Sequence, residues 1–385
     1  MTERTYFDWN ATAPLRAEAR AAVLGAFDVT ATASSVHSEG RAARGLIERA
    51  RGQVAALIGA EAKEVVFVSG ATEANALALT PELVVRGRQV TCDRLFVSAI
   101  EHSSVLSGGR FAPDRVERLS VLANGVIDVA ALKIAIAQAK TPLVSVMHAN
   151  NETGVIQPVA EIAAIVHEAG GILHVDAVQT AGRIACDMAA LAADMLTVSS
   201  HKIGGPQGAG ALIMRGVQPA AALLKGGGQE RGFRAGTESV AAIAGFGAAA
   251  EAAASTYEAA ADRMAALRDR FESLLRIATP QAMVFGAEVP RLPNTSYFSA
   301  PGVKAETAVI SFDLNGVAVS SGSACSSGKV TQSHVLTAMA ADPALAAGAL
   351  RVSLGWTTTE PDIDRLIIAW KRVAAALLKR QAQAA

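Results

Sequence analysis

The sequence predicts an α/β protein in which helices flank a mainly parallel sheet, followed by a smaller α+β region. In residues 45–250, short apolar runs alternate with alanine-rich stretches of helical period, and those runs are continuously apolar. Continuous apolar runs are typical of strands buried on both faces, and their alternation with helices favours parallel pairing. The 385 residues also exceed the roughly 250–300 at which a single core stops growing. We therefore expect a large domain over residues 15–254 and a small one that combines residues 1–14 with 255–385.

The expected elements lie on either side of a long helical stretch. Residues 238–278 have helical character but are too many for one ordinary globular helix, so we expect a bend or break there and a passage into the second domain. Beyond this stretch, apolar runs at 294–300, 307–322 and 350–355 and a terminal amphipathic helix predict the α+β region. The strand candidates that precede it are residues 64–70, 94–100, 142–150, 171–177, 194–200 and 210–215.

Composition argues against several classes of protein. The 35 basic and 35 acidic side chains give no net charge, which indicates neither a nucleic-acid nor a membrane partner. The N-terminal MTERTYFDWN lacks the apolar core of a signal peptide, and no apolar run reaches the roughly 18 residues of a membrane span. Three widely spaced cysteines argue against a disulfide framework and for a reducing compartment. We expect a soluble cytoplasmic protein.

Polar side chains gather at the ends of the expected strands, where open α/β sheets bind ligands. Gly70, Ala71 and Thr72 in VSGATEAN would expose N–H groups at a helix start, which suits a phosphate, although many strand–helix turns look alike. Asp176 in LHVDAVQ could equally cap the next helix. Lys202 in TVSSHK, taken alone, would be a surface lysine.

Taken together, these groups match the needs of pyridoxal phosphate. Its phosphate needs helix N–H groups, its ring nitrogen needs an acid that keeps it protonated, and its aldehyde needs a lysine amine. Burial beside a cationic ring would favour the neutral, reactive amine of Lys202. The glycine-rich residues 203–210 would then be poor in side chains because a cofactor lies over them.

Two further strand ends carry polar residues. His102 in SAIEHSSV could stack as a neutral imidazole on a planar ring, or it could bond the backbone of its own loop. Asn150 in VSVMHANNETG could bond a ring hydroxyl, or it could serve the turn that the following residues predict. The sequence alone leaves both pairs of interpretations open.

The cysteines and one arginine complete the set of candidates. Cys92 and Cys186 have apolar or strand-edge neighbours and are expected to be structural or incidental. Cys325 in SSGSACSSGKV lies on a segment that we expect to be flexible and exposed, where it could be a mobile nucleophile or an incidental loop cysteine. Arg351 in LRVSLG has a planar fork that suits a substrate carboxylate, with a structural salt bridge as the alternative.

Nine motifs, in order along almost the whole chain, make the sequence similar to a known family. It resembles the cysteine desulfurases of the NifS/IscS type, in the class V, fold type I aminotransferase superfamily. The motifs are HSEGRAAR, VSGATEANALAL, SAIEHSSVL, VSVMHANNETGVIQPV, HVDAVQTAG, SSHKIGGPQGAGAL, GGGQERGFRAGTES, SSGSACSSG followed by SHVLTAM, and RVSLGWTTTE.

The resemblance implies a seven-stranded type of central sheet and pyridoxal phosphate bound covalently through Lys202. It places Asp176 at the ring nitrogen, His102 stacked on the ring, and Gln179 and Asn150 near the ring hydroxyl. The partner subunit of a homodimer would add a further phosphate contact. The implied phosphate contacts are Ala71, Thr72, Ser199 and His201, with Thr237 supplied by the partner.

The resemblance also implies conversion of L-cysteine to L-alanine. Arg351 and Asn150 would bind the substrate, Lys202 and His102 would carry protons, and Cys325 would be the nucleophile that forms a persulfide. The sulfur would pass to an acceptor such as an iron–sulfur scaffold protein. Three departures from the family pattern bear on acceptor preference and not on a catalytic position: VTQS before HVL, the sequence GPQG, and Trp356.

Two alternatives remain open at this point. One is a selenocysteine lyase or another class V enzyme; a simple aminotransferase would not need the Cys325 thiol. The other is a non-catalytic iron–sulfur scaffold that binds iron transiently through Cys325. The cysteines are too scattered in the sequence for a self-contained cluster site, so we expect no metal in the isolated protein.

Overall fold

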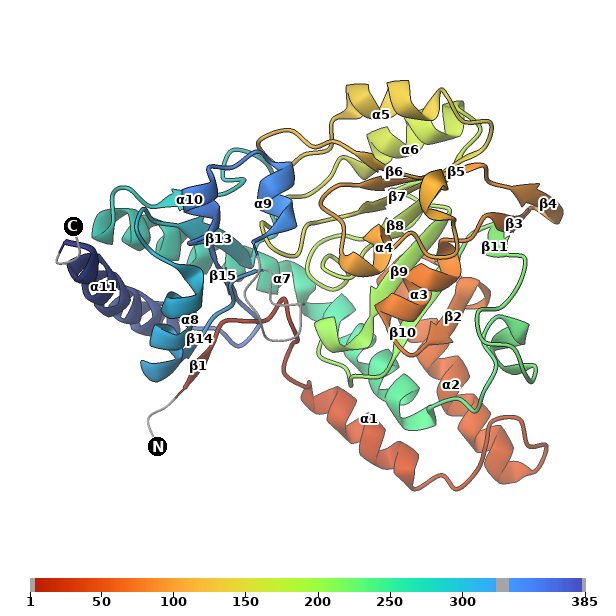
Figure 1. The fold of residues 1–385 in the computed structure, drawn as a ribbon. Coiled ribbons are helices and arrows are strands. Elements are labelled where there is room, and N and C mark those ends of the chain that lie inside the picture. The colour runs from red at the N-terminus through yellow and green to blue at the C-terminus, as the bar shows by residue number, and fades with distance from the viewer. Residues whose placement is uncertain (1–3, 323–331, 383–385) are drawn as a thin grey trace.

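The computed structural model describes residues 4–322 and 332–382, and a seven-stranded sheet forms its centre (Figure 1). Strands β5 to β9 pair in parallel with one another, whereas β10 runs antiparallel to both its neighbours. The mainly parallel sheet predicted from the sequence is therefore confirmed. In spatial order the strands are β2 (Val65–Val68), β10 (Gly210–Met214), β9 (Met195–Ser199), β8 (Ile172–Asp176), β7 (Pro142–Met147), β5 (Arg94–Ser98) and β6 (Val116–Leu119).

Continuous apolar runs form these strands because both faces of the sheet are covered. Val65 and Phe67 belong to a core shared with the long helices, whereas the alternating Val66 and Val68 belong to a second core around α3 (Ala71–Ala78). All six strand candidates contain a strand of this sheet. The sequence did not indicate β6, whose half-exposed residues 116–119 lack such a run. Helices that contribute to the first core include α2 (Ser38–Leu57), α5 (Val129–Ile136), α6 (Val159–Glu168) and α7 (Val240–Ala278).

The expected break in residues 238–278 is wrong, because α7 is one uninterrupted helix of 39 residues. It contains no proline, and alanine has the highest helix propensity. Its glycines serve close packing: a Cβ at Gly247 would lie 2.5 Å from Ala50 in α2, and one at Gly245 would lie 2.6 Å from Val23 in α1 (Ala17–Phe27). Close packing of its N-terminal part against α1 and α2 thus helps to stabilise a helix of unusual length.

The C-terminal half of α7 carries the chain into a separate hydrophobic core. Phe271 of α7 packs with Phe298 and Trp370, which belong to β13 (Thr295–Ser299) and α11 (Glu360–Ala382). The expected domain boundary between residues 254 and 255 stays a prediction, since it falls within a continuous helix. Other elements of this region are β12 (Met283–Val284), α8 (Ala305–Leu314), β14 (Val317–Ala318), α9 (His334–Ala338), α10 (Pro343–Ala346) and β15 (Leu350–Ser353).

The N-terminal segment joins the two regions. Its strand β1 (Thr5–Tyr6) pairs with β14, and Phe7 lies in the second region's core, before the chain reaches α1 beside the large sheet (Figure 1). Among the described residues, no helix is both long and apolar enough to cross a membrane. The remaining elements are α4 (Ser103–Leu106) and a small sheet of β3 (Glu82–Val85), β4 (Arg88–Thr91) and β11 (Val217–Pro219).

We predict that His174→Gln flattens the pH dependence of stability. Burial lowers the pKa of His174 to about 4, below the roughly 6.5 of an unfolded histidine. The folded chain therefore resists protonation, and stability that is fully present above about pH 6.5 is lost as the pH falls towards 4. Between about pH 7 and 5, His174 should cost the wild-type protein on the order of 2 kcal/mol of unfolding free energy, and the glutamine variant should not show this loss. Urea unfolding at each pH measures the difference.

The matched control is His37→Gln, at an exposed histidine. In the folded protein His174 bonds Ser145 Oγ (2.8 Å) and Thr197 Oγ1 (2.9 Å), so the glutamine variant also loses some stability at pH 7. Only the slope against pH tests the prediction. A slope equal to that of the wild-type protein would contradict it.

Candidate active site

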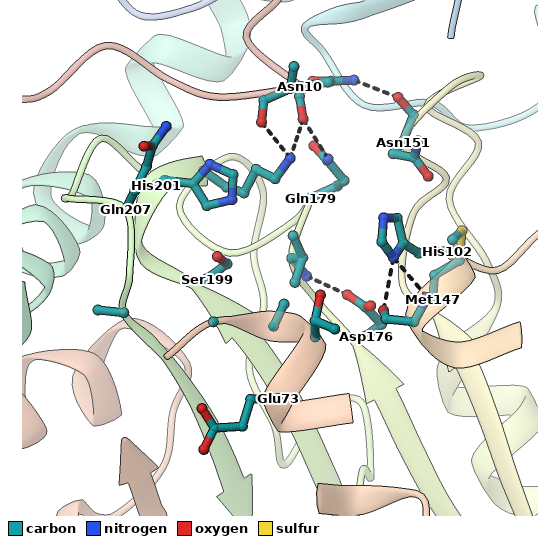
Figure 2. Close-up of a pocket in the computed structure, with 18 of the residues that line it drawn as sticks. Asn10, Glu73, His102, Met147, Asn151, Asp176, Gln179, Ser199, His201 and Gln207 are labelled. Atoms are coloured by element: carbon teal, nitrogen blue, oxygen red, sulfur yellow. Dashed lines mark hydrogen bonds between the residues drawn. The ribbon is translucent and has the colours of Figure 1, made fainter. Parts of the chain in front are cut away.

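A cavity of about 510 Å³ lies at the edge of the central sheet where β7, β8 and β9 end. Parallel strands bring their carboxyl ends to one edge, where open α/β sheets bind ligands. Figure 2 shows Asp176 and Ser199, the last residues of β8 and β9, beside this cavity. The predicted site residues that line it are Ala71, Thr72, His102, Asp176, Gln179, Ser199, His201, Lys202 and Arg351.

The start of α3 forms one wall of the cavity. The N–H groups of Ala71 and Thr72 lie in the first turn of the helix, where no helical carbonyl is available to them. A Cβ at Gly70 would meet no atom within 4 Å, whereas one at Gly210 would lie 2.7 Å from the Gly70 backbone. Gly210 thus lets β10 pack directly behind the turn. This end of the cavity is open and electropositive, which suits an anion.

Asp176 and His102 are connected through an amide that the sequence analysis did not single out. Asn75 donates to Asp176 Oδ2 (3.0 Å) and to Ser104 Oγ (2.9 Å). Ser104 Oγ lies 2.8 Å from Nδ1 of His102, and the Ser104 N–H donates to the same nitrogen at 3.1 Å. Asp176 Oδ1 accepts the Val178 N–H at 3.0 Å, so the carboxylate also holds its own turn.

The two histidines of the cavity are neutral near pH 7. Burial is the main cause that lowers the pKa of His102. Burial, followed by the charges of Lys202 and Arg183, lowers the pKa of His201 to about 4. Because the Ser104 N–H donates to Nδ1 of His102, that nitrogen is an acceptor and the ring proton lies on Nε2. His102 therefore bonds its own loop and also presents a neutral ring to the cavity.

Lys202 ends a short 3₁₀ turn (Ser200–Lys202) that follows β9, and its amine lies at the cavity. Nζ donates to the carbonyl oxygens of Asn10 (2.6 Å) and Ala11 (2.7 Å). Figure 2 shows Asn10 accepting both this bond and one from Gln179 Nε2, at 3.0 Å. The N-terminal segment thus positions the lysine, although almost two hundred residues of sequence separate them.

The glycines after Lys202 have a different explanation from the one the sequence suggested. A Cβ at Gly205 would lie 2.2 Å from Ser200 Oγ, and one at Gly204 would lie 2.6 Å from the Trp356 ring. Both glycines are therefore required by packing within the protein. Gly208 lines the cavity, where a Cβ would meet no atom within 4 Å. The expectation that a cofactor accounts for the whole segment holds at most for its second half.

Arg351 reaches the cavity from the second region, although only 4% of the residue is exposed. Its Nη2 donates to Asp8 Oδ1 (2.6 Å) and its Nη1 to the Asn151 carbonyl (3.1 Å). Nε is buried and has no hydrogen-bond partner among the described residues. The salt-bridge alternative is therefore real, and the guanidinium also lines the cavity, so the two interpretations are compatible.

The geometry of Asn150 supports the turn interpretation and not a cavity contact. Its Oδ1 accepts the N–H groups of Glu152 and Thr153, both at 2.9 Å, and its Nδ2 donates to the Ile100 carbonyl at 3.0 Å. The side chain is fully buried, and the following residue, Asn151, lines the cavity instead. Sequence pattern could not distinguish the two adjacent asparagines.

Four other candidates lie away from the cavity or outside the described residues. Thr237 is exposed and does not line the cavity of its own chain. Cys325 lies in residues 323–331, outside the described part of the chain. Cys92 and Cys186 are buried free thiols whose pKa values burial raises to about 12, as expected of structural cysteines.

Sequence reasoning missed Asp8, Asn10, Asn75 and Arg183, which hold the predicted residues in place. Asp8 and Asn10 stand in FDWNATAPL and Asn75 in TEAN, within stretches that carry the family resemblance, and this was the available signal. Their contacts depend on the fold, because they join segments far apart in the sequence. Within residues 4–322 and 332–382, no cluster of three or more histidine, cysteine or acidic side chains could hold a metal ion.

Comparisons with known proteins agree with this site. Residues 5–366 match the family model described as aminotransferase class-V. A cysteine desulfurase of Sinorhizobium fredii is 40% identical over 97% of this chain and 96% of that protein, and one of Archaeoglobus fulgidus is 40% identical over 94% of each. The structure of a NifS-like protein from Rickettsia africae aligns with a TM-score of 0.86 and 34% identity, over 97% of this chain and all of that one. The chain therefore belongs to the class-V aminotransferase family, whose enzymes use pyridoxal phosphate.

Proposed function

We propose that this protein is a pyridoxal-phosphate-dependent cysteine desulfurase. It converts L-cysteine to L-alanine and keeps the sulfur on Cys325 as a persulfide. The observation that carries the proposal is one cavity lined by an amine, a buried carboxylate, a helix N-terminus and a guanidinium, from Lys202, Asp176, α3 and Arg351. Curated relatives at 40% identity over nearly the full chain, named cysteine desulfurases, support it.

The described residues fit pyridoxal phosphate. Lys202 supplies the amine, and Asp176 supplies a carboxylate whose oxygens accept N–H groups from Asn75 and Val178. The open wall at Gly70 leaves room for a phosphate at the helix start. His102 offers a neutral ring face and Gln179 an amide. Further phosphate contacts come from Ala71, Thr72, Ser199 and His201.

When bound, the cofactor acts as an electron sink that eases loss of the substrate Cα proton. Arg351 orients the substrate carboxylate with its planar fork. Lys202 and His102 move protons at the substrate carbon atoms. The Cys325 thiolate forms a bond with the substrate sulfur while the substrate carbon–sulfur bond breaks. The electron pair of the broken bond stays with the carbon, which takes up a proton. Cysteine and the enzyme thiol thus become alanine and the enzyme persulfide.

The described residues on either side of residues 323–331 lie near the cavity. Gly322, the last described residue before Cys325, lines the cavity. On the far side, His334 Nε2 bonds the carbonyl of Glu101 at 2.9 Å, next to His102. The chain therefore leaves and returns close to the site.

The alternatives are less well supported. A simple aminotransferase has no use for Cys325, and a non-catalytic iron–sulfur scaffold has no use for a cavity with Lys202 and Asp176. Transfer of the persulfide sulfur to an acceptor such as an iron–sulfur scaffold protein remains part of the proposal, as does transient binding of iron through Cys325. A cytoplasmic location is supported by the free thiols of Cys92 and Cys186.

We also propose a homodimer, in which Thr237 completes the phosphate site of the partner. Val36 is 86% exposed and follows Ala33 and Ser34, which share a hollow of about 480 Å³ with Gly228–Arg231 and Glu238. An apolar side chain thus stands exposed beside the segment that carries Thr237. A second copy of the chain that covers this surface would bury both the Val36 side chain and the hollow.

Substitutions of Lys202 and Cys325 separate the roles of amine and thiol. Lys202→Ala should lower alanine formation from L-cysteine on the order of 10³-fold, because the proton carrier and the covalent link are lost. Cys325→Ala should still change its visible absorption when L-cysteine is added but should release neither alanine nor sulfide. Cys92→Ala, outside the cavity, is the control. Normal sulfide release by Cys325→Ala would refute the proposed nucleophile.

Arg351→Lys tests the carboxylate contact. A lysine keeps the charge but loses the bidentate fork, so KM for L-cysteine should rise about 10- to 100-fold, with a smaller change in kcat. The control is Arg291→Lys, at a buried arginine that pairs with Glu272 at 2.8 Å and lies outside the cavity. Equal KM values for the Arg351 variant and the wild-type enzyme would leave the guanidinium with a structural role only.

Sedimentation tests the dimer. The wild-type protein should sediment at twice the 39.5 kDa of one chain. Val36→Asp should shift it towards the monomer and weaken cofactor retention about tenfold, because Thr237 no longer reaches the partner's site. Leu314→Asp, at a side chain of similar exposure (82%), should do neither. An active wild-type monomer would overturn the proposal.

A further inference from the structure

Arg183 is a buried cation whose contacts are all neutral. Only 7% of the residue is exposed, and it lies behind Gln179 and Lys202, in the turn that follows β8. Every acceptor that it contacts in the described part of the chain is a carbonyl or amide oxygen. These are Asn10 Oδ1 (3.1 Å), Gln179 O (3.2 Å), Gln179 Oε1, Trp9 O (3.1 Å) and Lys202 O (3.4 Å).

This arrangement is costly for the folded protein. A buried charge is normally paired, because its desolvation is otherwise not offset. Burial first, and the charge of Arg351 second, lower the pKa of Arg183 to about 9, which still leaves it protonated near pH 7. A hydrophobic side chain or a surface-directed arginine would avoid the cost. The position of this cation therefore points to a ligand with negative charge on the other side of Gln179.

Arg183 also determines which end of the Gln179 amide faces the cavity. A guanidinium only donates hydrogen bonds, so the amide atom that it contacts must be the oxygen. The nitrogen is then the end that lies towards Asn10 and the cavity, and it donates one proton to the Asn10 carbonyl at 3.0 Å. One N–H of Gln179 remains for a ligand. The orientation follows from chemistry and does not depend on how the amide was assigned.

We propose that Arg183 is a positioning residue of the cofactor site: it fixes Gln179 so that the amide offers only N–H groups to the cavity, and it places a positive charge behind them. Together the two residues favour an oxygen anion of bound pyridoxal phosphate. The inference rests on the proposed cofactor site and adds to it a residue that does not line the cavity. Other charged or titratable groups around this site are Asp8, Glu73, His102, Asp176, His201, Lys202 and Arg351.

The first test is the visible absorption of the cofactor-loaded protein, titrated between about pH 6 and 10. Arg183→Met should raise the pH at the midpoint of the absorption change by about one unit, because the cation that favours the deprotonated cofactor is lost. Arg183→Lys keeps the charge and should stay near the wild-type midpoint. The matched control is Arg16→Met, at a buried arginine that also bonds a carbonyl in the lysine turn, Ile203 O at 2.9 Å, but does not contact Gln179.

A double-mutant cycle tests whether Arg183 acts through Gln179. If it does, Arg183→Met should shift the midpoint less in a Gln179→Ala background than in the wild-type background. An equal shift in both backgrounds would refute the positioning role. A wild-type midpoint in Arg183→Met, with the cofactor bound, would refute the inference while leaving the proposed function intact. Loaded wild-type protein without any visible band would refute the proposed cofactor site itself.

Gln179→Glu covers the case in which Arg183→Met does not fold. The glutamate keeps an oxygen partner for Arg183, so the fold should be retained, but its other oxygen can no longer donate to the ligand. Equilibrium dialysis of the cofactor-free protein should then show pyridoxal phosphate binding about tenfold more weakly. Unchanged affinity and midpoint in this variant would overturn the proposal.

Discussion

The parallel register of β7, β8 and β9 is the constraint on which the candidate site depends. Met147 pairs with Asp176, the last residues of β7 and β8, and Asp176 pairs with Thr197, so β9 runs only to Ser199 beyond them and all three strands end at one edge. Side chains alternate between the faces of a strand, and a shift of one residue would turn Asp176 away from the cavity. Both faces of the sheet are packed with apolar residues, which hold the register. Polar chemistry is therefore confined to the strand ends and to the turns that follow them.

The N-terminal segment completes the site from outside the sheet. Asp8 holds Arg351, and the carbonyl oxygens of Asn10 and Ala11 accept the amine of Lys202. The neighbouring Phe7 is fully buried in the core of the second region. The same few residues thus connect the second core to Lys202, so folding of the two regions and assembly of the site are coupled. Local unfolding of this segment would disturb Lys202 and Arg351 at the cavity at once.

Much of this arrangement could be predicted because it is encoded locally. Apolar runs gave the six strands, and the polar residues at their ends, among them Asp176 and Lys202, line the cavity as the topology requires. Contacts between distant segments could not be predicted in this way. Packing against α1 and α2 accompanies the continuity of α7, and two N–H groups of its own turn occupy Oδ1 of Asn150. Neither effect leaves a periodic pattern in the sequence.

The charges around the cavity explain why its parts must be held so firmly. Asp8 offsets Arg351, and Arg234 offsets Glu73, while burial keeps His102 and His201 neutral. Two cations, Lys202 and the deeper Arg183, then remain beside the carboxylate of Asp176, before any ligand adds its own negative charge. Backbone carbonyl oxygens hold both cations, so neither can relax towards water without breaking several hydrogen bonds. A ligand that carries a phosphate, joined by a substrate that carries a carboxylate, meets charges that are already oriented, and its binding requires little reorganisation of the protein.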